Sequence, residues 1–407
     1  MSSIFESFLA TPEVVEALSD SNFVAAMLRF EAALARAQAS VGLIPQSAAQ
    51  SIVGTCKVEL FDVPKLARES GRTHCMASPL VDRLRETVGL FNPEAEGFVH
   101  LGCSSQDVID SAMALVTRDV LELITADLSQ AIAVLLALAA RHAGDPVLAR
   151  AQLQPVSMTT FGLRCSHWAA LLVRNQQRLQ SAADNALSVQ LGGAAGTRAE
   201  TKSKGQSVIA LMAADLKLQD PTVAWHTQHA EKIALAAELG LLVGSLGEIA
   251  RDISFMSQAD VGELANAEVP AELAQGVAAV EATQNRNTAV CMVALAAAKR
   301  VPQQVATLLA CMSQEHERDL GNWQAELAEW PTLLMSAHGA TRAVLQVLSG
   351  LQVNSQRMRT NLDARRSALP AKDAAVSFSP KLAERAAALT LAQIKTLEAL
   401  NKATTPA

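Results

Sequence analysis

Four stretches of the chain keep an apolar stripe at helical spacing over unusual lengths: residues 106–144, 159–188, 226–260 and 288–314. Because the mean helix of a globular protein has about 11 to 12 residues, these lengths predict a bundle in which side chains meet across long seams. Helices that are apolar on several faces need further neighbours. We therefore expect an obligate oligomer.

The composition supports a helical fold. Half of the 407 residues are apolar, only 3% are aromatic, and there is no Tyr. Such a chain favours helices packed on helices, so we predict an all-α fold. The net charge of −6 is spread without a basic block, which argues against nucleic acid as a partner. An anionic substrate would have to be held by local Arg residues.

Cysteine spacing and the most apolar segment bear on metal binding and location. The six cysteines show no CxxC or Cys/His ligand spacing, so we expect reduced thiols and no metal. The first residues lack a basic region followed by an apolar one, which predicts no secretory signal and a cytoplasmic protein. Residues 233–253 carry Glu238, Glu248 and Arg251, which favours a buried helix over a membrane span.

Changes of pattern along the chain suggest three parts. Residues 1–103 read as an N-terminal domain of short helices, 104–349 as a central long-helix bundle, and 350–407 as a shortened C-terminal helical region. Residues 69–79 read as a loop that could face a cleft. The glycine-rich turn at 190–197 lacks the preceding strand and the GxxxxGK[ST] pattern of a phosphate-binding loop, so close backbone packing or a substrate-facing loop is the preferred interpretation.

Two polar clusters mark the starts of long helices. Ser104 and Ser105 stand where a loop becomes the first one, and their hydroxyls with the free amides of the first turn suit an anion. The alternative is a simple N-cap by either serine. His226 opens the third long pattern and can titrate near neutrality. The alternative there is an ordinary hydrogen-bonded histidine.

A third polar cluster covers residues 314–326. Arg318 could clamp a substrate carboxylate or pair with an internal one. Glu315 and Glu317 fit a solvated or internally paired helix end better than a catalytic role. Nothing in the spacing alone decides between these possibilities.

Taken together, the motifs resemble a known family. The segments 102–110, 192–197, 225–228, 251–253 and 315–318 follow the order and spacing of the fumarase/aspartase superfamily, most closely its 3-carboxy-cis,cis-muconate cycloisomerase branch. The likeness covers roughly residues 5–365. It implies an all-α homotetramer with a shared helical core and active sites built from three subunits. It also implies closure of a muconate di- or tricarboxylate to a γ-lactone in protocatechuate-type aromatic catabolism, without metal or organic cofactor.

The resemblance also implies site residues. The expected substrate-binding set is Ser104, Ser105, Gln106, Arg150, Gln154, Arg286, Asn287 and Arg318. The candidate proton carriers are His226 and His142.

Two family motifs are altered. The signature Gly-Ser-Ser-x-Met-Pro-x-Lys-x-Asn corresponds to residues 278–287, where Ala279 replaces the serine and Asn285 the lysine. The family's Gly-Arg-Thr-(His or Trp)-x-Gln corresponds to residues 149–154, which keep Arg150 and Gln154 but lose the ring.

These departures leave alternatives open. One is a catalytically silent paralogue that keeps the tetrameric scaffold, and another is a C–N or C–O lyase acting on an aspartate- or malate-like substrate. A sulfonated muconate is an alternative substrate for the cycloisomerase itself. Because positioning alone can contribute about 7 to 11 kcal/mol to an intramolecular reaction, loss of the signature serine need not abolish activity.

Overall fold

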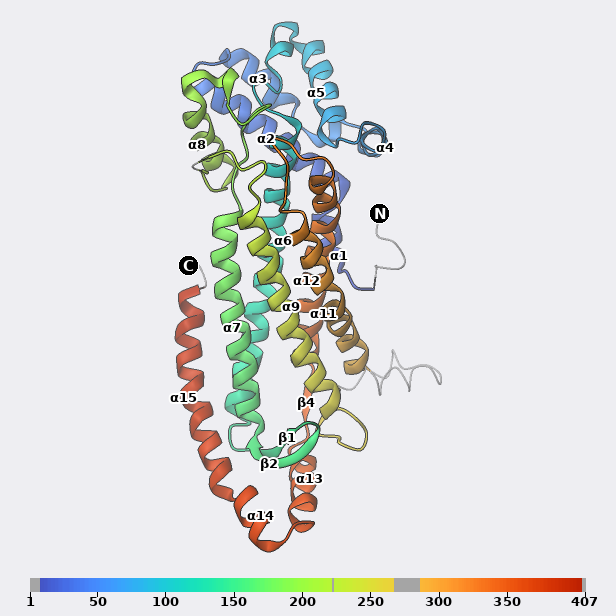
Figure 1. The fold of residues 1–407 in the computed structure, drawn as a ribbon, viewed down its shortest axis with the longest axis vertical. Coiled ribbons are helices and arrows are strands. Elements are labelled where there is room, and N and C mark those ends of the chain that lie inside the picture. The colour runs from blue at the N-terminus through green and yellow to red at the C-terminus, as the bar shows by residue number, and fades with distance from the viewer. Residues whose placement is uncertain (1–7, 222, 267–285, 405–407) are drawn as a thin grey trace. The chain divides into compact units, whose positions relative to one another are not determined.

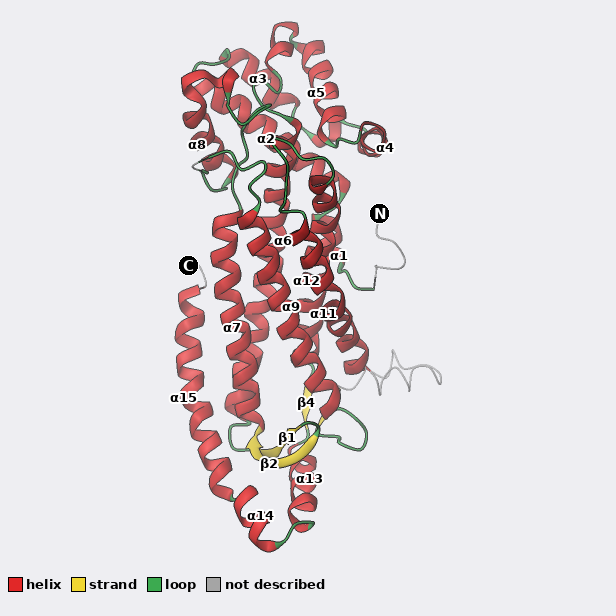
Figure 2. Ribbon diagram, in the orientation of Figure 1, coloured by secondary structure: helices red, strands yellow, loops and turns green. Residues whose placement is uncertain are grey.

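The computed structural model describes residues 8–221, 223–266 and 286–404, and these form mainly helices (Figures 1 and 2). The chain divides into two compact units, each assembled from three separate stretches. The first unit comprises residues 1–123, 180–237 and 303–335, and the second comprises 124–179, 238–302 and 336–407. The three-part division expected at residues 103 and 349 stays a prediction.

Short helices make up much of the first unit: α1 (Pro12–Ala17), α2 (Asp20–Ser40), α3 (Gln46–Thr55), α4 (Val63–Thr73), α5 (Ala77–Phe91) and α8 (Gly205–Leu216), with 3-10 turns η1 (Val58–Leu60), η2 (Pro93–Phe98) and η3 (Ala199–Lys204). The N-cap of α1 follows from its sequence, because the Thr11 hydroxyl accepts the Val14 N–H ahead of a first-turn Pro12. The segment 69–79, expected as a loop, is helical up to Thr73 and again from Ala77.

All four predicted long helices are present: α6 (Ser105–Arg141), α7 (Phe161–Ala186), α9 (Ala230–Met256) and α11 (Arg286–Ala310). Two more are α12 (Asn322–Ser349) and α15 (Pro380–Thr404). Shorter helices α13 (Ser355–Ser367) and α14 (Ala371–Ser377) lie between them in sequence. Both α11 and α12 contain an internal proline, Pro302 and Pro331, and each continues past it despite the lost backbone donor.

Two small antiparallel sheets qualify the all-α prediction. Strand β1 (Pro146–Ala151) pairs with β2 (Gln154–Thr160), and β3 (Leu264–Asn266) pairs with β4 (Leu351–Val353). The first hairpin turns through Gln152 and Leu153, with φ of 52° and 63°. Two positive φ values are typical of a type I′ turn, which usually contains Asn-Gly. This sequence therefore gave no signal for the hairpin.

The helices α6 and α9 are long and apolar enough to cross a membrane by length and composition alone. In the folded chain, 50% and 56% of their most apolar windows are buried, and core helices pass the same test. In α9, Leu239, Leu242 and Leu246 are fully buried. The burial of α9 agrees with the prediction that residues 233–253 form a buried helix.

The end of α6 and the start of α7 approach closely at Gly162. A Cβ atom there would lie 2.5 Å from Ala143 Cα and 2.6 Å from the Ala139 carbonyl oxygen. Both neighbours are backbone atoms that cannot turn away. The crossing therefore requires glycine at this position.

We expect Gly162→Ala to destabilise the protein by about 1 to 3 kcal/mol, because the added methyl group overpacks the crossing. The matched control is Gly54→Ala in α3, where no atom of the described residues lies within 4 Å of the new Cβ. That change should stabilise by about 0.5 to 1 kcal/mol through helix propensity. Chemical denaturation of both variants checks the pair, and equal shifts would contradict the close crossing.

Candidate active site

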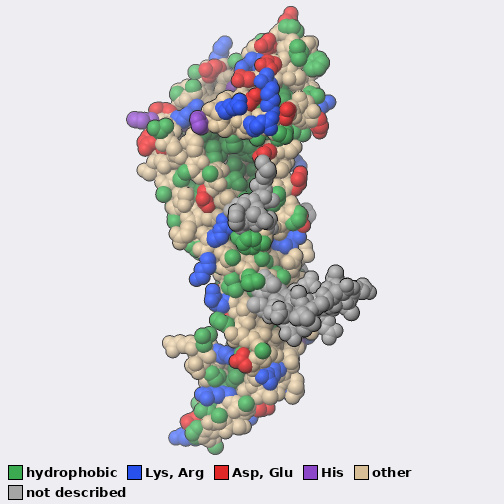
Figure 3. Space-filling view, turned by 90° about the vertical axis from the view of Figure 1, so that its right-hand side faces the viewer, with side chains coloured by type: hydrophobic (Ala, Val, Ile, Leu, Met, Phe, Trp, Pro, Cys, Tyr) green, Lys and Arg blue, Asp and Glu red, His purple; other side chains and the backbone are tan. Residues whose placement is uncertain are grey.

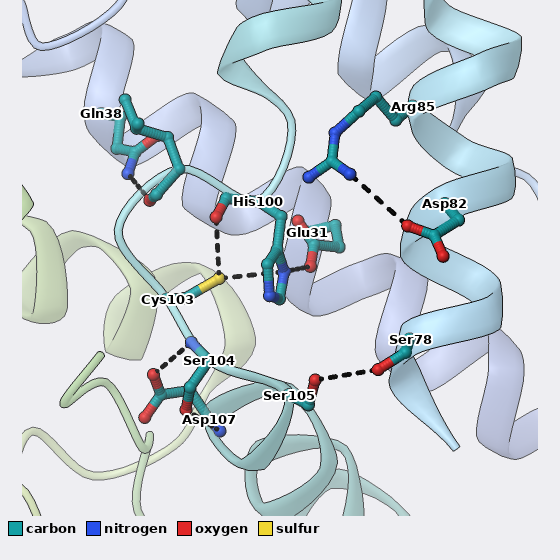
Figure 4. Close-up of polar contacts among 11 residues, drawn as sticks. Glu31, Gln38, Ser78, Asp82, Arg85, His100, Cys103, Ser104, Ser105 and Asp107 are labelled. Carbon is teal, nitrogen blue, oxygen red and sulfur yellow. Dashed lines mark hydrogen bonds and ion pairs between the residues drawn. The ribbon is translucent and has the colours of Figure 1, made fainter. Parts of the chain in front are cut away.

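A reciprocal pair of hydrogen bonds sets the start of α6 (Figure 4). The Ser104 hydroxyl accepts the Asp107 N–H at 3.3 Å, and the Asp107 carboxylate accepts the Ser104 N–H at 2.8 Å. This arrangement is a capping box with Asp in the third position. The N-cap alternative for Ser104 is therefore present in the structure. Its hydroxyl acts there as an acceptor, so the hydroxyl proton can still be donated to an anion.

The carboxylate of Asp107 also fastens the glycine-rich loop. It accepts the N–H of Gly192 at 2.8 Å and that of Gly193 at 2.9 Å, and the residue is fully buried. Gly193 has a φ of 71°, which favours glycine. The loop therefore packs closely against the start of α6, which is one of the two roles expected for it; a substrate-facing role stays a prediction.

His226 lies over the same loop. A Cβ atom on Gly196 would stand 2.8 Å from its Cε1 atom, and the side chain of Gln106 donates to its backbone carbonyl. Trp225 anchors this turn through bonds to Gln190 and Val189. The turn precedes α9, which begins only at Ala230. Residues 104–107 and His226, far apart in sequence, thus form one cluster, here named the α6 cap site.

Two buried atoms of the α6 cap site have no hydrogen-bond partner among the described residues, Gln106 Oε1 and His226 Nδ1. Buried polar atoms are nearly always satisfied by protein, water or ligand. A molecule bound at this site could therefore accept a proton from the His226 imidazole or donate one to it. The arrangement combines hydroxyl, helix N-terminal amide and imidazole groups.

Ser105 extends the site towards α5. Its hydroxyl lies 3.4 Å from that of Ser78, which donates to the Cys75 sulfur at 3.2 Å. Burial raises the pKa of Cys75, but hydrogen bonds from Ser78, Ser105 and the Ala77 N–H outweigh it and lower the pKa below its usual value. Cys75 and Ser78 belong to the segment 69–79 that was expected to face a cleft, but neither was among the predicted site residues.

A cavity of about 520 Å³ lies beside Cys75, between residues of α2, α4, α6 and α12. His74 and Cys75 line it together with side chains such as Phe23, Met27 and Ile109. Its walls are mostly apolar, and apolar walls cannot replace the water lost by a carboxylate. An acid substrate therefore fits the α6 cap site better than this cavity.

A buried ion network joins α9 to α12 in the same unit. Glu326 accepts Lys232 Nζ at 2.5 Å and His229 Nδ1 at 2.7 Å, and Lys232 lies 5.0 Å from the Trp330 ring centre. Burial raises the pKa of Glu326, but Lys232 and His229 outweigh it and lower the pKa to about 2. Asp110, four residues after Gln106 on α6, accepts a hydrogen bond from Trp323 Nε1 at 2.9 Å.

The predicted site residues of the second unit have their own partners. Arg150 forms a bidentate pair with the fully buried Glu263, at 2.9 and 2.7 Å. His142 Nδ1 lies 2.8 Å from Asp145. Gln154 is exposed at the start of β2. Binding of substrate by Arg150 or Gln154 and proton transfer by His142 stay predictions.

The structure gives no substrate-binding geometry for the remaining predicted residues. Arg318 is exposed in the segment between α11 and α12, next to Asp319, which accepts the Asn322 N–H at the start of α12. Arg286 and Asn287 begin α11, but their side chains lie outside the described part of the chain. Ala279 and Asn285 of the altered signature also lie outside it.

Comparison with known proteins gives a consistent family. A model of the lyase family matches residues 7–273. The chain is 38% identical over 360 residues to the 3-carboxy-cis,cis-muconate cycloisomerase of Pseudomonas putida, covering 88% of this chain and 84% of that protein. It is 40% identical over 386 residues to the protein of that name from Bradyrhizobium diazoefficiens, covering 95% and 84%. A crystal structure of the 3-carboxy-cis,cis-muconate lactonizing enzyme from Pseudomonas putida superposes with a TM-score of 0.86 at 32% identity, covering 100% of both chains.

The low pKa of Glu326 predicts an acid-sensitive fold. The folded pKa of about 2 lies below the ordinary value of 4.5, so the ionised network stabilises the protein above about pH 4.5 and is lost as the pH falls towards 2. Glu326→Gln should cost about 3 to 5 kcal/mol at neutral pH, since it leaves buried Lys232 without its counter-charge. In the variant, the free energy of unfolding, measured by chemical denaturation at a series of pH values, should fall less steeply below about pH 4.5 than in the wild type.

The control is Glu122→Gln, whose carboxylate is 74% exposed and 3.9 Å from Arg118. An exposed pair of this kind contributes about 0 to 1 kcal/mol. If the free energy of unfolding of Glu326→Gln falls with decreasing pH as steeply as that of the wild type, the acid sensitivity does not come from this network.

Proposed function

This chain belongs to the lyase family, as its likeness to the fumarase/aspartase superfamily indicated, and we propose that it is a cycloisomerase that closes 3-carboxy-cis,cis-muconate to a γ-lactone. The observation that supports the proposal is the α6 cap site, where Gln106 on the first turn of α6 donates to the His226 carbonyl and the His226 ring lies against the glycine-rich loop that Asp107 binds. The names of the relatives agree with this substrate.

The reaction is an intramolecular addition. A carboxylate oxygen of the substrate attacks its own double bond, a C–O bond forms, and the electron pair of the double bond takes up a proton at the α-carbon. Holding the acid in a near-attack shape can contribute about 7 to 11 kcal/mol. A positioned acid or base typically contributes about 10²- to 10⁴-fold in rate.

The geometry suggests a role for each residue of the site. Ser104 offers its hydroxyl proton beside the first-turn amides of α6, which together suit a carboxylate. Ser105 can join them only by turning its hydroxyl proton away from Ser78. His226 is the proposed proton carrier, because its Nδ1 atom has no hydrogen-bond partner within the part of the chain that the structure describes. Gln106 donates to the His226 carbonyl, so in this orientation it positions that residue and offers only its carbonyl oxygen to other groups.

Cations must balance the substrate, because buried Asp107 already brings a negative charge to the same helix end. We propose that a cytoplasmic homotetramer supplies them, with Arg286 and Arg318 as the cations and Asn287 as a neutral hydrogen-bond donor, all acting across subunits. Large apolar side chains exposed on α9 and α11 support an assembly: Leu241 is 53%, Met292 58% and Leu309 51% exposed. Figure 3 shows hydrophobic side chains exposed among charged ones on one face, and such surface suits association.

The direct test follows the diene absorbance of 3-carboxymuconate with purified protein and identifies the product by NMR. We expect loss of absorbance above the buffer control and a γ-lactone product. A folded oligomer that turns over neither this acid nor its sulfonated analogue would support the silent paralogue. Release of a fumarate-like product from an aspartate- or malate-like substrate would support a C–N or C–O lyase.

The proton-carrier role of His226 has its own test. His226→Gln should lower kcat about 10²- to 10⁴-fold, the usual contribution of one acid or base, while leaving KM within a few fold. The control is His316→Asn, since His316 is exposed with a φ of 51° that Asn tolerates. If His226→Gln keeps kcat within threefold of the wild type, His226 is not the proton carrier. His142→Gln should then be the variant that lowers kcat.

A further inference from the structure

Three groups that bind metals meet just before α6: Glu31 from α2, and His100 and Cys103 from the loop that leads to Ser104 (Figure 4). Each offers one ligand atom, and these atoms all lie within 4.8 Å of one another. The α6 cap site uses none of them. His100 and Cys103 stand only three residues apart, a His-x-x-Cys spacing that the prediction of no metal overlooked, whereas Glu31 lies far away along the chain.

The imidazole of His100 is the centre of the cluster. Its Nδ1 atom lies 2.6 Å from Glu31 Oε1 and 3.1 Å from Cys103 Sγ. One ring nitrogen carries at most one proton, so it cannot donate to both neighbours at once. A cation in place of that proton would contact nitrogen, oxygen and sulfur together.

A second observation points to a missing ligand. Glu31 is only 1% exposed, yet its other oxygen, Oε2, has no hydrogen-bond partner among the described residues. An unpaired oxygen on a buried carboxylate is costly. It could complete a bidentate contact to a cation or hold a water that fills a fourth position.

The distances suit a small cation after a modest adjustment. Bonds of about 2.0 Å to nitrogen, 2.0 to 2.2 Å to oxygen and 2.3 Å to sulfur in a tetrahedral site separate the ligand atoms by about 3.3 to 3.6 Å. The observed 2.6 and 3.1 Å contacts would need to open by less than about 1 Å. His100 and Cys103 lie on a loop, where such a shift is small.

We propose that Glu31, His100 and Cys103 form a binding site for a divalent transition-metal ion of the Zn²⁺ class. Mixed nitrogen, oxygen and thiolate ligands favour Zn²⁺ or Co²⁺ over Mg²⁺ or Ca²⁺. Binding displaces the thiol proton of Cys103 and any proton on His100 Nδ1 to solvent, and no electron is transferred. The ion would tie α2 to the loop, which Gln38 already holds through the Leu101 carbonyl at 2.7 Å.

The test titrates the reduced, full-length protein with Co²⁺ as a spectroscopic substitute for Zn²⁺. We expect one equivalent to bind, with a thiolate-to-cobalt charge-transfer band and displacement by Zn²⁺. Cys103→Ser should remove the band and weaken binding by more than about tenfold, since even groups that only hydrogen-bond to metal ligands contribute about 10- to 100-fold.

The matched control is Cys75→Ser, because Cys75 lies in the same unit and bonds Ser78 rather than the cluster. It should keep the band and the affinity. Glu31→Gln tests the carboxylate and should weaken binding while leaving the band in place. Absence of a thiolate band in the wild-type protein, or its persistence in Cys103→Ser, overturns the proposal whether or not every variant folds. The readout is metal binding, so it is independent of the proposed cycloisomerase activity.

Discussion

The buried carboxylate of Asp107 is the interaction on which the candidate site depends. It accepts three backbone N–H groups, from Ser104, Gly192 and Gly193. A buried charge without such donors costs several kcal/mol, so the start of α6 and the glycine-rich loop must stay together. His226 lies over that loop. One carboxylate therefore fixes both the start of α6, which carries Ser104, and the loop against which the His226 ring lies.

The same arrangement places one negative charge at the start of α6, because the Asp107 carboxylate is bound there. The first turn of a helix attracts anions, and a substrate carboxylate would be a second one. In the second unit, the fork of Arg150 is bound to Glu263. A di- or tricarboxylate would need cations beside these groups, and the proposed assembly would supply them from neighbouring subunits.

The sequence predicted the long helices because their apolar spacing persists over many turns. The Thr11 cap is equally local, since its hydroxyl accepts an N–H only three residues further on. Motif order identified the family. Contacts between side chains far apart in sequence could not be predicted from spacing. Glu326, for example, pairs with His229 and Lys232, which lie about a hundred residues earlier in the chain. Spacing also could not show whether an Arg such as Arg150 faces a substrate or an internal acid. The altered signature lies outside the described residues, so its role stays a prediction.

The hairpin between β1 and β2 has a consequence for engineering. Gln152 and Leu153 both occupy left-handed backbone conformations at its tip, which cost roughly 1 to 2 kcal/mol for each non-glycine residue. An Asn-Gly dipeptide adopts the same turn with little strain. The tip is therefore a place where this scaffold can be made more heat-resistant without touching either the helical core or the α6 cap site.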